Sequence, residues 1–343
     1  MFKKNVLWST IAILLIATML LGACQAAQVE EPVVEEEPAE TVAALPQGQE
    51  LANAYAGMYK GTVVTMAGPF TDQDEVVFND SIAAFEEQTG IDIQYTGSKE
   101  FEANINIRLD GGDAPDIADY PQPGLLRYAV EKGYAIDMNT LIDPDWIKTN
   151  YSQAWQDLGT MTGPNGDIVA GIWARANGKS FVFYPKKAFD EAGYTVPTTW
   201  EEMMTLTEQI ASDGDTPWCI GIESGAATGW TMTDWIEDLM LRVAGGEAYD
   251  QWVAGELKFD SPEMNEVLDY IEAIWFNDAY VYGGRAAIPT INFGDAPKPM
   301  FENPPKCWFN RQGNFVTTFF PEESVAGEDY SFFYLPGIKE EHG

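Results

Sequence analysis

The sequence predicts an α/β fold built as more than one lobe. Strand patterns and helix patterns alternate along the chain from about Tyr59, and glycine and proline residues separate them. The 343-residue chain leaves too many residues after this point for one small hydrophobic core, and their number suits two lobes of ordinary size.

The first strand, helix and strand follow one another between residues 61 and 95. Residues 61–67 (GTVVTMA) are β-branched and apolar, as in a buried strand, and Gly68 and Pro69 end it. Apolar residues at i, i+4 and i+7 then predict a helix, and Gly90 stands where a C-terminal cap belongs. Alternating apolar side chains over residues 91–95 predict the second strand. Such a β-α-β unit, with a right-handed crossover, starts a parallel sheet.

Further helices and strands alternate through the rest of the chain. A second helical stripe covers residues 101–109, and residues 115–118 lead into another short strand. Residues 199–202 (TWEE) form a capping box, which predicts that a helix begins there. Residues 230–243 and 262–276 are expected to form two more helices.

The N-terminus has the layout of an export signal. Two lysines precede an uncharged apolar stretch over residues 6–21, which is shorter than the roughly 20 residues of a usual membrane span. The stretch ends in Leu21-Gly22-Ala23-Cys24, which resembles the lipobox of bacterial lipoproteins. We expect residues 1–23 to be a lipoprotein signal peptide and Cys24 to carry the lipid. The alternative is an uncleaved membrane anchor.

Residues 24–58 are expected to form an acidic, flexible tether. Residues 25–49 are rich in Glu, Pro, Ala and Val and contain no basic residue. Such a composition cannot bury enough apolar surface to offset the entropy of ordering, and its like charges extend the chain. A solvated acidic helix is the alternative, against which Pro32 and Pro38 argue.

The charge of the chain excludes one class of partner. The formal net charge is −35, so we expect no nucleic acid, because phosphate binding needs clustered Lys and Arg. A neutral or cationic ligand is compatible with this charge.

The cysteines predict a disulfide. If Cys24 carries a lipid, Cys219 and Cys307 remain as a pair in an oxidising compartment. Two buried thiols that never meet are the alternative. The single histidine, His342, and the absence of any cysteine or histidine cluster lead us to expect no metal and no cofactor.

Three segments resemble a known family. Residues 90–93 (GIDI), residues 111–117 (GGDAPDI) and the run from Tyr184 to Glu202 are similar to segments of the extracellular solute-binding proteins of ABC importers, the family that includes the maltose-binding protein. Residues 217–238 and 307–315 look closest to the branch associated with α-glucoside uptake. Pro185 stands where the family usually has asparagine. Full-length members continue beyond the equivalent of Gly343, so we expect part of the second lobe and of the site to be absent.

The resemblance implies a two-lobed periplasmic-binding-protein fold of type II. Each lobe is expected to be a mostly parallel sheet flanked by helices, with hinge crossovers and the ligand in the cleft. The expected first lobe is residues 59–175 and 310–333, and the expected second lobe, incomplete, is residues 176–309 and 334–343. The implied protein is an extracytoplasmic, lipid-anchored receptor for a sugar or oligosaccharide. Its partners would be permease subunits with a separate ATPase chain, because no G-x-x-x-x-G-K-[ST] loop occurs here.

The candidate binding residues are aromatic, amide or charged side chains on loops at strand ends and near the expected crossovers. Aromatic rings pack on the apolar faces of sugar rings, and planar polar groups pair with adjacent hydroxyls. The candidates are Phe70, Asp72, Asp119, Gln122, Arg175, Asn177, Trp230, Asp234, Arg311 and Gln312. Arg311 is the preferred one, since a guanidinium suits vicinal hydroxyls or a carboxylate. The alternative for Asp72 and Asp234 is that each stabilises a helix N-terminus. The alternative for the loop after residue 118 is that it is an ordinary surface loop.

Two other functions compete with a sugar receptor. A polyamine or cation receptor of an ABC importer fits the net charge, but the basic residues near the crossovers argue against it. A secreted glycoside hydrolase would need two carboxylates about 5 to 10 Å apart across the scissile bond, and no pair stands out in the sequence. We therefore expect a binding protein and not an enzyme.

Overall fold

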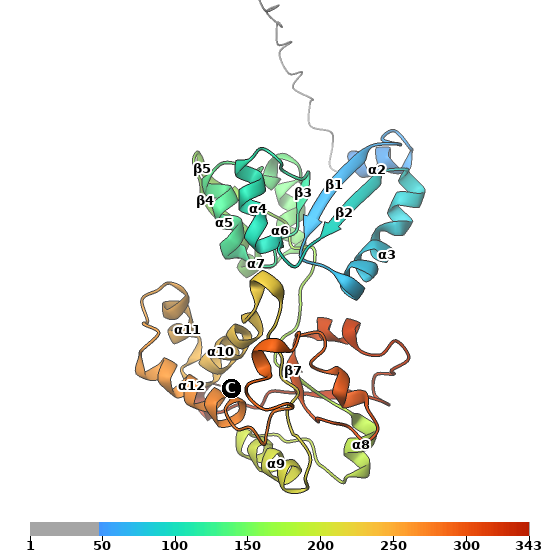
Figure 1. The fold of residues 1–343 in the computed structure, drawn as a ribbon. Coiled ribbons are helices and arrows are strands. Elements are labelled where there is room, and N and C mark those ends of the chain that lie inside the picture. Colours follow the sequence, from blue (N-terminus) through green and yellow to red (C-terminus); the bar gives the residue numbers. More distant parts are fainter. Residues whose placement is uncertain (1–47, 343) are drawn as a thin grey trace, which may run out of the picture. The chain divides into compact units, whose positions relative to one another are not determined.

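The computed structural model describes residues 48–342 (Figure 1). The expected signal peptide, Cys24 and most of the expected tether lie outside these residues. The described part begins with helix α2 (Gln49–Tyr55), at the end of the segment expected to be a tether. None of the described helices is long and apolar enough to cross a membrane.

The first lobe is organised around a parallel sheet in the order β2-β1-β3. β1 (Val63–Gly68) pairs along its length with β2 (Asp92–Gly97), and its end pairs with the short β3 (Ile117–Ala118). Helix α3 (Asp72–Thr89) connects β1 to β2 and is capped by Gly90, whose φ of 71° is the left-handed conformation that glycine adopts readily. The predicted β-α-β unit and its parallel sheet are confirmed.

The remaining elements of this lobe follow the sheet along the chain. They are helices α4 (Phe101–Asp110), α5 (Pro123–Glu131), α6 (Pro144–Asn150) and α7 (Gln153–Gly159), the 3-10 turn η1 (Met138–Thr140), and an antiparallel hairpin of β4 (Thr160–Gly163) and β5 (Gly166–Val169). Phe101 and Ile105 of α4 are buried with Ala67 of β1, so α4 packs on the sheet.

The second lobe contains an antiparallel sheet in the order β7-β6-β8. β6 (Phe181–Tyr184) leaves the segment that connects the lobes, and β7 (Asn310–Gln312) and β8 (Ser331–Tyr334) run back toward it. The N–H of Leu335 donates to the carbonyl of Ser180 at 2.7 Å, so the end of β8 lies beside the start of β6. We expected a mostly parallel sheet in this lobe, and this expectation was wrong. Strands that return to the connector must run opposite to β6, so parallel pairing in this lobe is limited to isolated bridges.

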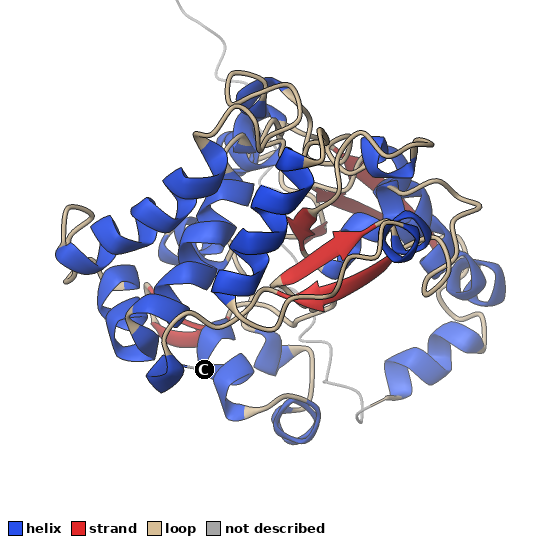
Figure 2. Ribbon diagram, turned by 90° about the horizontal axis from the view of Figure 1, so that it is seen from below, coloured by secondary structure: helices blue, strands red, loops and turns tan. Residues whose placement is uncertain are grey.

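Helices supply most of the core residues beside this sheet. Figure 2 shows the helices of the described chain in blue and its strands in red. They are α8 (Lys186–Glu191), α9 (Trp200–Ser212), α10 (Trp230–Val243), α11 (Gly245–Val253) and α12 (Pro262–Trp275), with the 3-10 turns η2 (Gly225–Ala227), η3 (Ile288–Thr290), η4 (Lys298–Phe301), η5 (Asn314–Phe319) and η6 (Glu340–His342). The predicted capping box of Thr199 and Glu202 opens α9. Met203, Leu239 and Ile271 of α9, α10 and α12 meet in the buried centre.

Residues 310–333 group differently from the expected lobe boundary. We expected them in the first lobe, but β7 and β8 pair with β6. Phe309 and Phe333 are also buried in the core that α9, α10 and α12 share. The two strands in this range therefore belong to the sheet of the second lobe, whereas η5 between them also lies beside α3 of the first lobe.

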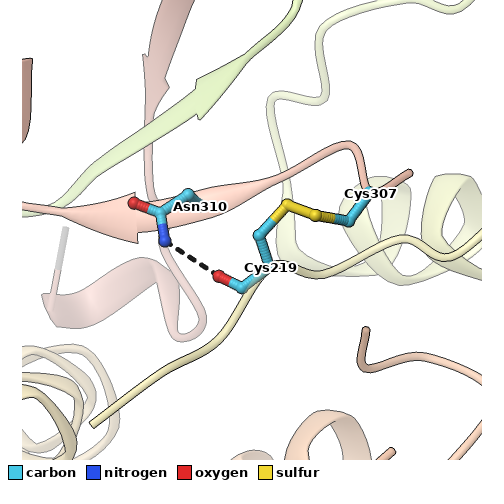
Figure 3. The surroundings of a disulfide bond; sticks show 3 residues. All are labelled: Cys219, Cys307 and Asn310. Carbon is cyan, nitrogen blue, oxygen red and sulfur yellow. Dashed lines mark hydrogen bonds between the residues drawn. A yellow bond between two sulfur atoms is a disulfide. The ribbon is translucent and has the colours of Figure 1, made fainter. Parts of the chain in front are cut away.

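The predicted disulfide joins Cys219 and Cys307 (Figure 3). Their Cα atoms are 5.5 Å apart and both side chains are buried. The Asn310 amide donates to the carbonyl of Cys219 at 2.8 Å. The bond and this hydrogen bond fix the start of β7 against the segment that follows α9.

Candidate ligand-binding site

An aromatic cluster lies where β1 ends in the first lobe. Phe70 stacks on Tyr95 of β2, with ring centroids 6.0 Å apart and an interplanar angle of 26°. The Tyr95 hydroxyl accepts a hydrogen bond from the N–H of Phe70 at 2.8 Å. Burial raises the pKa of Tyr95 above its ordinary value, so this hydroxyl stays protonated. These contacts fix the start of the loop after β1 against β2.

Two glycines allow this close approach. A Cβ at Gly97 would lie 1.8 Å from the carbonyl oxygen of Phe70, and one at Gly68 would lie 2.6 Å from the Tyr95 hydroxyl. Both distances are far below van der Waals contact. A larger residue at either position would push the loop away from β2.

Arg175 covers the cluster from the connector between the lobes. Its guanidinium donates to Asp74, in the first turn of α3, at 3.1 and 3.2 Å. The same group lies 4.9 Å from the centre of the Phe70 ring. Arg175 therefore faces a carboxylate and an aromatic ring of the first lobe, and its side chain keeps 35% of its surface exposed.

Asp119 lies beside this cluster, directly after β3. Its N–H donates to the carbonyl of Ala67 at 2.8 Å, which continues the pairing of β3 with β1. Burial raises the pKa of the Asp119 carboxyl, although the charge of Arg175 acts in the opposite direction. A half-buried carboxyl at this edge of a parallel sheet can pair with a ligand hydroxyl.

Asp72, Gln122 and Asn177 lie at or near the surface. Asp72 begins α3 and forms an ion pair with Lys99 at 3.0 Å, whose hydrogen bond lowers the pKa of the Asp72 carboxyl. The Gln122 amide donates to Glu102 at 3.0 Å. Asn177 is exposed in the connector. Asp72 and Gln122 thus have protein partners, whereas Phe70, Asp119 and Arg175 lie in one cluster.

Trp230 and Asp234 lie one turn apart at the start of α10 in the second lobe. The Trp230 ring packs against Phe293, with centroids 5.1 Å apart, and against Phe315, at 5.8 Å. The Lys179 ammonium is 2.5 Å from a carboxylate oxygen of Asp234 and 5.1 Å from the centre of the Trp230 ring. Both candidates therefore contact the same lysine.

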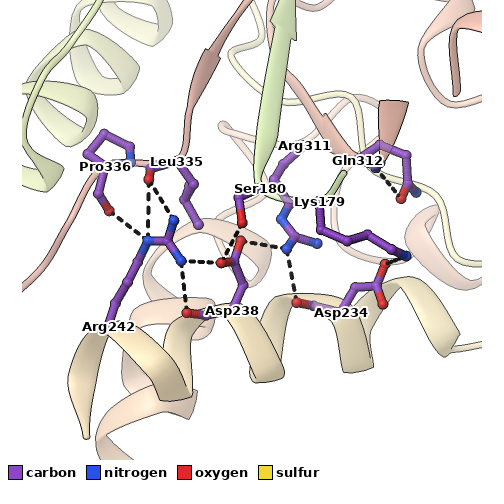
Figure 4. Close-up of polar contacts among 10 residues, drawn as sticks. Lys179, Ser180, Asp234, Asp238, Arg242, Arg311, Gln312, Leu335 and Pro336 are labelled. Carbon is purple, nitrogen blue, oxygen red and sulfur yellow. Dashed lines mark hydrogen bonds and ion pairs between the residues drawn. The ribbon is translucent and has the colours of Figure 1, made fainter. Parts of the chain in front are cut away.

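Arg311 and Gln312 lie in the interior, on β7. The Arg311 guanidinium is 2.5 Å from a carboxylate oxygen of Asp238 and donates to the carbonyl of Asp234 at 3.0 Å (Figure 4). Its side chain is only 1% exposed. The preferred candidate of the sequence analysis is thus a buried partner of α10, because a carboxylate on that helix already neutralises it.

Asp238 joins two arginines and the strand ends. Ser180 donates to its carboxylate at 2.7 Å, and Arg242 forms a second ion pair with it (Figure 4). Arg242 also donates to the carbonyls of Leu335 at 2.9 Å and Pro336 at 3.1 Å. The network therefore ties the start of β6, β7 and the end of β8 to α10.

The profile of the bacterial extracellular solute-binding protein family matches residues 71–298, across both lobes. The chain belongs to this family. Its members are binding proteins, so the glycoside hydrolase alternative does not apply, and the extracellular location of the family agrees with the predicted export. Within residues 48–342, no group of three or more His, Cys, Asp or Glu side chains is placed to hold a metal ion.

Two curated relatives of this solute-binding protein are similar over most of the chain. It is 43% identical over 284 residues to the alpha-glucosides-binding periplasmic protein AglE of Rhizobium meliloti. This match covers 81% of this chain and 61% of AglE. The chain is 40% identical over 280 residues to the osmoprotective compounds-binding protein GgtB of Synechocystis. This match covers 82% of this chain and 65% of GgtB. The chain therefore spans less than two thirds of the length of either relative.

Solved structures of solute-binding proteins share the fold. The solute receptor AcbH matches with a TM-score of 0.65 at 21% identity, over 82% of this chain and 68% of that one. The maltose-bound MalE3 of T. maritima matches with a TM-score of 0.59 at 16% identity, over 81% and 68%. The predicted α/β, two-lobed fold is confirmed.

The sequence analysis missed several side chains that build this region. Asp74 and Tyr95 hold Arg175 and Phe70 in the first lobe, and Phe293 and Phe315 hold Trp230 in the second. Tyr95 carried a signal, since it is the last apolar side chain of the alternating run, two residues before Gly97. The two phenylalanines carried none, because only the fold brings them to the start of α10.

Proposed function

We propose that the chain is the substrate-binding component of a carbohydrate ABC importer, and that its ligand is an α-glucoside or a related oligosaccharide. The observation that carries this proposal is the 43% identity to a protein named for α-glucoside binding, over 284 residues that include both lobes. The ligand would be captured between the lobes and delivered to permease subunits driven by a separate ATPase chain.

The geometry supports a sugar ligand in two ways. In the first lobe, the aromatic ring of Phe70 and the half-buried carboxyl of Asp119 follow two neighbouring strands of one sheet. In the second lobe, Trp230 and Asp234 place an aromatic ring and a carboxylate on one face of α10. An aromatic face combined with a polar group that fixes hydroxyls is the usual composition of a specific small-molecule site.

We retain eight of the candidates as proposed ligand contacts. They are Phe70, Asp72, Asp119, Gln122, Arg175, Asn177, Trp230 and Asp234. Arg311 and Gln312 are proposed to act from the interior, by holding β7 against α10, since both side chains are buried. This division separates side chains that a ligand can reach from those that support them.

Thermal unfolding across a panel of solutes tests the proposed function. A ligand that binds only the folded chain must raise the midpoint by mass action. We expect maltose or trehalose to raise it, whereas cellobiose, with a β-linkage, serves as the matched control. A shift with spermidine alone would instead favour the polyamine receptor that the net charge of −35 allows.

We also propose that the chain is a lipoprotein. A lipid on Cys24 would anchor it to the cell membrane, in the periplasm or on the outer face of the cell. The support is the apolar stretch of residues 6–21 and the small residues before Cys24. In cells labelled with palmitate, the wild-type chain should carry the label in the membrane fraction. The Cys24→Ala variant should lose the label, and its retention there would contradict this assignment.

A further inference from the structure

The ammonium of Lys179 lies in a cage built by other elements of the second lobe. Its nitrogen is 5.1 Å from the centre of the Trp230 ring and 5.4 Å from that of Phe315. The same nitrogen is 2.5 Å from a carboxylate oxygen of Asp234 (Figure 4). Two aromatic rings and one carboxylate therefore surround a single positive charge.

The walls of this cage are held independently of the lysine. Trp230 and Asp234 are one turn apart on α10, and the carbonyl of Asp234 accepts a hydrogen bond from the buried Arg311 at 3.0 Å. Phe293 packs edge-on against Trp230 at 5.1 Å, which fixes the ring from the other side. The cage should therefore persist when the lysine leaves it.

Lys179 itself is the less constrained partner. It belongs to the connector, outside any helix or strand, and its side chain is 41% exposed, compared with 16% for Asp234. A long side chain of this kind can rotate into solvent without unfolding the lobe. Aromatic rings with a carboxylate recognise ammonium groups in general, whichever molecule carries them.

We propose that Trp230, Phe315 and Asp234 form a binding subsite for an ammonium group, and that Lys179 occupies it in the ligand-free chain. Lys179 is then an internal competitor, which a ligand with its own ammonium group must displace. This subsite goes beyond the proposed sugar receptor. Its ligand group is either the amine of an amino sugar or the methylated nitrogen of a quaternary ammonium solute.

Removing the competitor should open the subsite. We would titrate the Lys179→Ala chain with tetramethylammonium chloride and follow the indole N–H signal of Trp230 by NMR, with sodium chloride at equal ionic strength as the reference. We expect saturable binding that is at least about tenfold tighter than in the wild-type chain. Lys258→Ala, which removes an exposed lysine outside the cage, should behave as wild type. The Lys179→Ala, Asp234→Asn double variant should lose the binding.

A folded Lys179→Ala chain that binds neither tetramethylammonium nor glucosamine more tightly than the wild type would overturn the proposal. If that variant does not fold, Lys179→Met keeps the apolar stem for the same titration. The wild-type chain gives a separate check, because both rings should shift the ε-methylene protons of Lys179 upfield. Signals at their ordinary position, unchanged in Trp230→Ala, would also contradict the proposal.

Two sugar probes separate the possible sources of the ammonium group. In Lys179→Ala, binding of glucosamine without binding of glucose indicates an amino sugar, whereas binding of tetramethylammonium alone indicates a quaternary solute. Because tetramethylammonium has no hydroxyl group, its failure to bind leaves the sugar receptor untouched. A chain that binds no glucoside but binds tetramethylammonium would contradict the proposed function and support this subsite.

Discussion

Arg311 and Asp238 form an ion pair in the interior of the second lobe, with the guanidinium nitrogen and the carboxylate oxygen 2.5 Å apart and the side chains 1% and 6% exposed. Asp238 also accepts from Ser180, directly before β6, and from Arg242, whose guanidinium donates to Leu335 directly after β8. Removing Arg311 takes one of two guanidinium partners from this buried carboxylate and leaves Arg242 and Ser180 to balance it.

Arg311→Ala should therefore lower the free energy of unfolding by about 3 kcal/mol, the lower end of the range for a broken buried pair, because Arg242 still faces Asp238. Urea unfolding of the purified variant measures this loss. Arg285→Ala is the matched control, because Arg285 pairs with Asp278 at the surface and its removal should cost less than about 1 kcal/mol. An Arg311→Ala chain of full stability that no longer binds its ligand would restore Arg311 as a direct contact.

Gly97→Ala should displace the loop that carries Phe70. The new Cβ would lie 1.8 Å from the Phe70 carbonyl oxygen, so the loop must move, and we expect both a lower midpoint of thermal unfolding and weaker ligand binding. Gly124→Ala in α5 is the control, since open space surrounds that position and alanine favours helix. Equal behaviour of the two variants would show that the close approach is unimportant.

The raised pKa of Asp119 makes its contribution to stability depend on pH. Burial favours the protonated carboxyl, so the folded chain binds more protons than the unfolded chain between the unfolded pKa, about 3.9, and the raised folded pKa. Stability should therefore fall as the pH rises through this window. Asp119→Asn should stabilise the chain at neutral pH and give no gain below about pH 4.

Asp72 provides the comparison for this prediction, because Lys99 lowers its pKa. Its contribution has the opposite sign, being present above the unfolded pKa and lost as the pH falls through the folded one. Asp72→Asn should thus give a small loss at neutral pH, since the pair with Lys99 is exposed. Unfolding midpoints of both variants, measured from about pH 3 to about pH 8, determine the sign of each effect on stability.

Loss of the disulfide should destabilise the second lobe. Cys219 and Cys307 are 88 residues apart, and opening a loop of this size should lower the free energy of unfolding by about 2 to 5 kcal/mol. The double variant Cys219→Ser, Cys307→Ser should show this loss in urea, and a reducing agent should produce it in the wild type alone. If the reducing agent lowers the free energy of unfolding of the double variant by the same amount, the loss does not come from this disulfide.

Local patterns in the sequence were sufficient to predict much of the fold. The β-branched run before Gly68 became β1, and the capping box of Thr199 and Glu202 opens α9. These features depend on neighbours within a few positions, so periodicity and capping residues reveal them.

The candidate site was harder to predict, because its side chains meet only after folding. The burial of Arg311 depends on Asp238, 73 positions earlier, and nothing local distinguishes that aspartate from the many exposed acids of the chain. Likewise, one wall of the cage around Lys179 is Phe315, which lies on η5, far from Lys179 in the sequence. The antiparallel direction of β7 and β8 was missed for the same reason, since strand pairing is not a local property.

Calorimetric titration of the purified chain with maltose, with Trp230→Ala measured beside it, tests the central claim most directly. We expect saturable binding to the wild type and affinity at least tenfold weaker in the variant, about 1.4 kcal/mol, with circular dichroism unchanged. Absence of binding to maltose and to every other α-glucoside, in a chain that is folded, would contradict a carbohydrate receptor.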